Sequence, residues 1–147
     1  MAKRNHIKVK VNSERPDFRV FASYFFGEDL HSYDSEGDSF PVTSKKWTEL
    51  YMGSRQESNL NFEICAISEN PLVLVVSSKE PENAYRIAYF LARETNGEIL
   101  DENNGIIPLR NLIKKMGNFN LQERLLLADQ SIWRRATEEN PYPNLNE

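Results

Sequence analysis

The sequence predicts a single α+β domain, in which a mostly antiparallel sheet of four to five strands packs against about three helices. Three observations predict this class. Short apolar runs with strand character come first, amphipathic helical patterns follow them, and the turns between the early runs are mostly short. We expect the domain to span residues 1–139, with residues 140–147, which include two prolines, as a C-terminal tail.

Two strands are predicted near the N-terminus. Ile7, Val9 and Val11 alternate with lysines, which is the period of a half-buried strand. After a turn at residues 12–17, residues 18–26 place apolar or aromatic side chains at both alternating sets of positions. We interpret residues 18–26 as a second strand that is covered on both faces.

The next part of the chain is predicted to contain a long loop and two strands. Residues 27–40 form a polar loop, and its length indicates a functional or mobile segment. Residues 41–52 fit a short helix or a strand, and we favour a strand. Residues 60–66 alternate clearly as a strand, and the turn at residues 69–71 leads into the following strand as a hairpin.

The centre of the predicted fold is residues 72–100. Residues 72–76 are a continuous run of leucine and valine, which is typical of a strand buried on both faces. Ser77 and Glu80 have the spacing of a capping box, and Pro81 suits the first turn of a helix. The sequence therefore predicts a buried strand that is followed directly by a capped helix.

An amphipathic helix is predicted after Pro81. One helical face carries five apolar residues at the spacing i, i+3, i+4, i+7 and i+8, and these are Ala84, Ile87, Ala88, Leu91 and Ala92. Gly97 suits the left-handed position that follows a last helical turn. Residues 98–100 are expected to return to the sheet as a short strand.

Two further helices are predicted to complete the domain. Residues 101–105 contain an Asn-Gly pair that indicates a turn, and Pro108 then begins a short helix. Asn120 and Glu123 have the spacing of a second capping box. We expect the helix that follows to run from residue 121 to about residue 137.

Composition excludes several classes of protein. No apolar run approaches the roughly 20 residues that a membrane-spanning helix needs, and the basic N-terminus lacks the apolar stretch of a signal peptide. The single cysteine, Cys65, excludes an internal disulfide, so we expect a cytoplasmic protein. A formal net charge of −4 argues against a general nucleic-acid binder.

The charge is unevenly distributed along the chain. Residues 1–19 carry six lysines and arginines against two acids, whereas residues 27–39 carry five acids and no lysine or arginine. Such an acidic segment suits a cationic partner, because it would steer association and can imitate nucleic-acid phosphates. The alternative is a solvated loop without a partner, which charge runs usually are.

Residues that could carry catalysis or bind a metal are few. Cys65 and His31 could form a nucleophile and base pair, but no nucleophile motif surrounds Cys65, and free cysteine is commonly a small apolar filler. His31 and its neighbouring acids lack the ordered spacing and closing glutamate of a calcium loop. Phosphate-binding glycine motifs and CxxC are absent from the sequence. We expect no catalytic residues, no metal and no cofactor.

The segment VSSKEPENAYRIAYFLARETNGEILDENNG, residues 76–105, resembles small bacterial immunity proteins of polymorphic or contact-dependent growth inhibition toxin systems. The shared features are a strand, an S-x-x-P helix start, an alanine-rich amphipathic helix and a short G-x-[IL]-x-D-E strand. The matching residues are Ser78, Pro81, Ala84, Ile87, Ala88, Leu91, Ala92, Gly97, Ile99, Asp101 and Glu102. The resemblance implies a cytosolic, non-enzymatic protein that binds and blocks one toxin domain. It carries over no binding residues.

We therefore expect a monomeric or weakly dimeric immunity protein that neutralises a cognate toxin domain, which we expect to be a nuclease. The expected partner-binding residues combine the acids with two aromatic anchors, and they are Glu28, Asp29, Tyr33, Asp34, Glu36, Asp38 and Phe40. The alternative is a small enzyme or ligand-binding domain that uses His31 and neighbouring acids, which would need a concave pocket around His31. A structural or phage-related assembly protein is the third possibility.

Overall fold

The computed structural model describes residues 5–26, 33–37, 43–55 and 59–143. Within these ranges the chain forms one α+β domain around a seven-stranded antiparallel sheet with the order β2-β3-β4-β5-β1-β6-β7. The strands are β1 (Asn5–Lys10), β2 (Tyr33–Gly37), β3 (Leu50–Ser54), β4 (Asn61–Glu69), β5 (Leu72–Ser78), β6 (Glu98–Leu100) and β7 (Ile106–Ile107). The α+β class is confirmed, but the expected four to five strands and three helices are too few.

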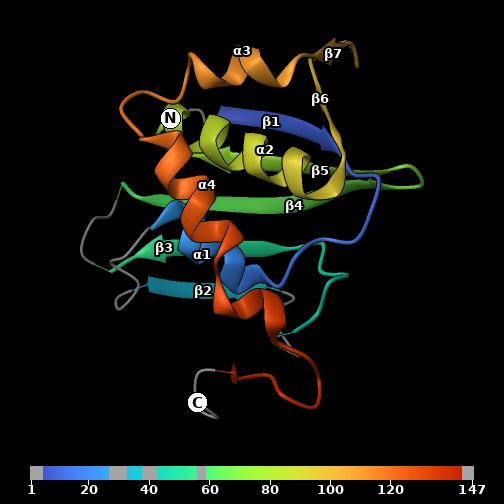
Figure 1. Ribbon diagram of the computed structural model, residues 1–147. Coiled ribbons are helices and arrows are strands. Elements are labelled where there is room, and N and C mark those ends of the chain that lie inside the picture. The colour runs from blue at the N-terminus through green and yellow to red at the C-terminus, as the bar shows by residue number, and fades with distance from the viewer. Residues whose placement is uncertain (1–4, 27–32, 38–42, 56–58, 144–147) are drawn as a thin grey trace.

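Four α-helices and one 3₁₀-helix are present in the described part of the chain. They are α1 (Phe18–Phe25), α2 (Pro81–Thr95), α3 (Leu109–Ile113), α4 (Leu121–Asp129) and η1 (Ile132–Arg135). Helix α2 packs across β1, β4, β5 and β6, while α1 packs against α2, α4 and η1. Figure 1 shows α1, α2 and α4 against one face of the sheet, and α3 beside β7 at its end. None of the described helices has the length and apolar character that a membrane crossing requires.

Helix α1 corrects the strand that the sequence predicts at residues 18–26. All eight of its side chains are buried, because it lies among the sheet and the other helices. Phe21 contacts the rings of Trp47, Phe62 and Phe90 with centroid distances of 5.5, 6.1 and 5.0 Å. Phe18, Phe21, Ala22 and Phe25 have the spacing i, i+3, i+4 and i+7 of a helical face. Because other positions of this short segment are apolar or aromatic as well, the same residues also fit the alternation of a strand covered on both faces.

The second correction concerns residues 27–52. Residues 33–37, which we expected within a polar loop, form the edge strand β2 and pair with β3 in antiparallel register. The expected strand at residues 41–52 begins only at Leu50. Trp47 lies before it, buried, with its indole Nε1 donating a hydrogen bond of 2.9 Å to the backbone carbonyl of Pro16. This contact holds the segment before β3 against the turn before α1.

The predictions for the central strand and helix are confirmed, and the predictions for the helix caps are wrong. All five residues of the predicted apolar stripe on α2 are buried. Ser77 belongs to β5, however, and the N-cap residue of α2 is Glu80, without a side-chain capping bond. At the other end Asn96, with φ 49°, takes the left-handed position instead of Gly97. Gly97 is needed for another reason, since a Cβ atom there would clash with the carbonyl oxygen of Lys10.

The C-terminal region differs from the expected long helix. Helix α4 ends at Asp129, and η1 begins after Ser131, whose hydroxyl accepts a hydrogen bond from the backbone N–H of Trp133. The predicted capping box is wrong, because the Asn120 side chain donates to the Glu123 carboxylate and caps no backbone N–H. Beyond η1, the ring of Tyr142 lies 5.4 Å from the Arg19 guanidinium. The start of the expected tail therefore packs on α1.

Candidate functional site

The expected partner-binding residues lie at the β2 edge of the sheet, as far as the structure describes them. Tyr33, Asp34 and Glu36 are on β2, which pairs with β3 on one side and is the last strand of the sheet on the other. Asp34 is exposed. The other expected residues, Glu28, Asp29, Asp38 and Phe40, lie outside the described residues, as does His31. The structure thus brings three of the seven together on one edge strand.

Asp34 has a basic neighbour that the sequence did not indicate. Its Oδ1 lies 2.8 Å from Nε of Arg55, just after β3. The two side chains are 57% and 63% exposed respectively. Such a solvated pair contributes about 0–1 kcal/mol to stability, because water and salt screen it. The pair does place one positive charge beside the acidic segment, so the local field is weaker than the run of acids alone implies.

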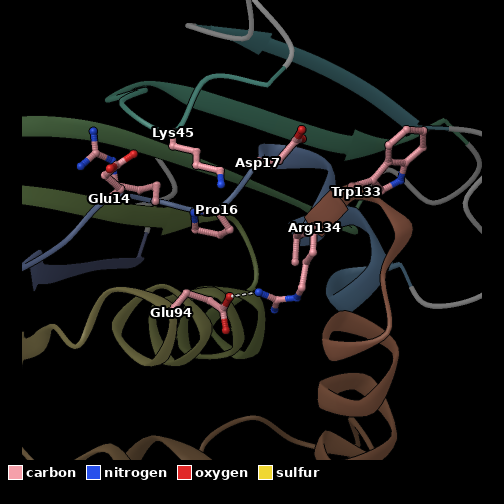
Figure 2. A pocket seen from close by; sticks show the side chains of 9 residues that line it. Glu14, Pro16, Asp17, Lys45, Glu94, Trp133 and Arg134 are labelled. Atoms are coloured by element: carbon pink, nitrogen blue, oxygen red, sulfur yellow. Dashed lines mark ion pairs between the residues drawn. The ribbon is translucent and has the colours of Figure 1, made fainter. Parts of the chain in front are cut away.

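A polar pocket of 310 Å³ lies on the helical side of the domain, where distant segments meet (Figure 2). The residues that line it are Glu14, Arg15, Pro16, Asp17, Val20, Lys45, Glu94, Trp133 and Arg134. Figure 2 shows Arg134 reaching from η1 to Glu94 at the end of α2. The pocket therefore has as many acidic as basic side chains in its described lining.

Most of the pocket's acids already have cationic partners. The Glu94 carboxylate accepts hydrogen bonds from Arg93 at 2.6 Å and pairs with Arg134 at 2.8 Å. Both arginines also reach Asp129 on α4, at 2.9 and 3.7 Å respectively. This network joins the ends of α2, α4 and η1. It accounts for Glu94 as a structural group and leaves it no free role as a general base.

Asp17 and Arg19 form the most buried ion pair in the described part of the chain. Arg19 donates to both Asp17 carboxylate oxygens, from Nε at 2.9 Å and from Nη2 at 2.7 Å. Asp17 Oδ1 also accepts the backbone N–H of Arg19 at 3.0 Å, so it caps α1. The guanidinium lies 4.1 Å from the Trp133 ring, which adds a cation–π contact. These contacts fix the start of α1 against η1.

Arg15 is held by backbone carbonyls instead of a carboxylate among the described residues. Its Nε donates to the backbone carbonyl of Trp47 at 3.0 Å. Burial lowers the pKa of Arg15, and the charge of neighbouring Glu14 partly opposes this. Even so, an arginine stays protonated in proteins.

The pocket of Figure 2 contains charged groups that hold segments together, and no serine, cysteine or histidine is among its described lining residues.

His31, on which the alternative hypothesis depends, lies outside the described residues, so of that hypothesis the structure places only Cys65 and the acids of β2. Cys65 is exposed on β4, where it pairs with Val75 of β5. No group of three or more histidine, cysteine, aspartate or glutamate side chains that could hold a metal occurs among the described residues.

The sequence could not indicate the pocket of Figure 2, because residues from four separate parts of the chain line it. Comparisons with family models, curated proteins and solved structures find no match for this chain.

Proposed function

We propose that the protein is a cytoplasmic immunity protein, which binds a cognate bacterial toxin domain and blocks it. The toxin domain we propose is a nuclease with a cationic substrate site. The observation that carries the proposal is the acidic segment of residues 28–38, whose residues 33–37 form the edge strand β2 and include the exposed Asp34. Residues 28–38 contain five acids and no lysine or arginine.

The position of β2 favours contact with a partner. Within the described residues β2 is paired only with β3, so its other edge is open to a second molecule. Asp34 and Glu36 lie on this strand, and a nuclease site carries positive charge because it holds phosphates. Opposing fields of this kind raise association rates by about 10–10³-fold at low salt. Tyr33 and Phe40 are the aromatic anchors in the proposal, since binding hot spots favour such residues.

Neutralising three acids is the direct test. In the variant Asp34→Asn/Glu36→Gln/Asp38→Asn, association with the product of the gene directly upstream is expected to slow and to lose most of its salt dependence. Tyr33→Ala is expected to speed dissociation instead, because anchors act mainly on the off-rate. Surface plasmon resonance at low and near-physiological salt measures both rates.

A matched variant separates the position of the charges from their number. Glu69→Gln/Glu138→Gln/Glu139→Gln removes the same charge from acids that are exposed outside β2. Its association rate is expected to stay close to that of the native protein at both salt concentrations. If the β2 variant associates at the native rate, or if the control slows equally, the acidic segment is not the interface.

Cys65→Ser tests the alternative of a small enzyme. We expect this variant to protect cells that express the upstream toxin domain as well as the native protein does, because Cys65 is an exposed residue of β4, which β3 separates from the acids of β2. Growth of the co-expressing cells is the measurement, with circular dichroism as a check on folding. Lost protection by a folded Cys65→Ser protein would favour catalysis by Cys65 with His31.

A further inference from the structure

A cavity larger than the pocket of Figure 2 lies at the opposite end of the sheet from β2, where β1, β6 and β7 meet α3. Its volume is 620 Å³, which is within the range of about 300–1,000 Å³ that is typical of ligand sites. Figure 1 shows this corner of the domain at the top, with β2 at the bottom of the sheet. Strands β3, β4 and β5 separate β2 from β1. We name this cavity the α3 groove.

The floor of the α3 groove is apolar. It is lined by Ile99 and Leu112, which are buried, and by Ile7, Tyr85 and Ile107, which are half-buried. The half-buried side chains leave apolar surface that faces the groove, and no described residue fills it. Removing this surface from water is favourable, at roughly 25 cal/mol per Å². The floor therefore suits a ligand with an apolar body.

The rim of the α3 groove is more basic than the rest of the chain. Lys8, Lys114 and Lys115 line it together with Asp101 and Glu102, so its formal charge is three minus two, or +1, with His6 neutral. The whole chain carries −4. A positive rim on an acidic protein selects an anionic group at this place.

The rim residues differ in how far they are already engaged. Lys8 Nζ donates to Asn104 Oδ1 at 2.7 Å, and Asp101 Oδ1 accepts the backbone N–H groups of Asn103 and Gly105, both at 2.8 Å. Lys115 Nζ lies 5.2 Å from the centre of the Tyr85 ring.

Lys114 is the free cation of the rim. It is exposed on the turn after α3, and its side chain has no hydrogen bond or ion pair with a described residue. Lys114 and Lys115 are therefore the two cations that can turn to a ligand at the smallest cost in existing contacts.

We propose that the α3 groove binds a small amphipathic anion. The apolar body of the ligand lies on the floor formed by Ile7, Ile99 and Leu112, and its single anionic head group lies at Lys114 and Lys115. An ammonium group is a point charge that accepts a carboxylate or a phosphate equally well, so the shared chemistry is one anionic head on an apolar chain. The site lies away from β2 and does not depend on the proposed toxin interface.

Calorimetric titration of the full chain tests the proposal with decanoate, decyl phosphate and neutral decanol. Decanoate or decyl phosphate is expected to bind saturably at one site per chain, and decanol at least about tenfold more weakly. Lys114→Glu/Lys115→Glu is expected to weaken binding of the anion by at least about tenfold. Lys45→Glu/Lys46→Glu, a second pair of adjacent exposed lysines, is the matched control and is expected to leave the affinity unchanged.

Amide chemical shifts of the native protein locate the ligand without any substitution. On addition of decanoate or decyl phosphate the changes are expected in residues 6–8, 99–107 and 111–115. Binding of decanoate alone assigns the head group as a carboxylate, and binding of decyl phosphate alone assigns it as a phosphate. No saturable binding of either anion, equal losses in the two lysine-pair variants, or shift changes confined to other elements would overturn the proposal.

Discussion

Replacing Asp17 with alanine is expected to lower the free energy of unfolding by about 3–5 kcal/mol. The Asp17 and Arg19 side chains are 2% and 6% exposed respectively, so neither charge is solvated in the folded protein. Without the carboxylate, the Arg19 guanidinium stays buried beside Trp133 without a counter-ion. Asp17→Ala also removes the cap at the start of α1. Urea denaturation followed by circular dichroism measures the loss.

Two further variants separate the charge from the cap. Asp17→Asn keeps an oxygen that can accept the backbone N–H of Arg19 but removes the negative charge, so it is expected to lose most of the same stability. Asp17→Ala/Arg19→Met removes both charges, and it is expected to recover part of the loss because no uncompensated charge stays buried. A loss below about 1 kcal/mol in Asp17→Ala would show that solvent reaches the Arg19 guanidinium.

The fold could be predicted from sequence where local pattern and final environment agree. In β5 a run of leucine and valine lies in the middle of the sheet, between β4 and β1. In α2 all five residues of the apolar stripe are buried and the charged residues are only partly buried, so the helical period is visible in the sequence. The turn between β4 and β5 is equally local, and its hairpin was predicted.

Prediction failed where distant residues decide the structure. Residues 18–25 fit both a helical spacing and a strand alternation, and the helix is the form that packs Phe21 against Phe62 of β4 and Phe90 of α2. The last helix ends at Asp129, and a new turn begins after Ser131, whose hydroxyl accepts a hydrogen bond of 3.0 Å from Ser23 of α1. In both cases tertiary contacts override the pattern within the segment.

The candidate surfaces show the same division. The sequence located the acids of residues 28–38 by composition, but it could not show that Tyr33–Gly37 is an edge strand, or that Arg55 lies beside Asp34. The α3 groove is lined by β1, α2, β6, β7 and α3. Its lysines and isoleucines become one site only when β1 lies between β5 and β6, and a central position for the first strand has no signal in the N-terminal sequence.

Leu91→Ala is expected to lower the free energy of unfolding by about 2–5 kcal/mol, because it leaves a cavity between α2 and the sheet. Leu91 is fully buried in the core cluster, on the face of α2 that also contains Ile87 and Ala88. The surrounding aromatic side chains pack closely, as the stacked rings of Tyr24 and Phe90 at 4.1 Å show. A core held by such rings relaxes little around a void, so most of the lost contact is not regained.

Leu126→Ala is the matched control for this cavity. The chemical change is the same and also lies within a helix, but Leu126 on α4 is 55% exposed. Its loss is expected to stay within about 1 kcal/mol, since little apolar surface returns to water. Denaturant titration of both variants gives the two losses on one scale. If Leu91→Ala lowers the free energy of unfolding no more than Leu126→Ala does, the apolar stripe of α2 does not form part of the core.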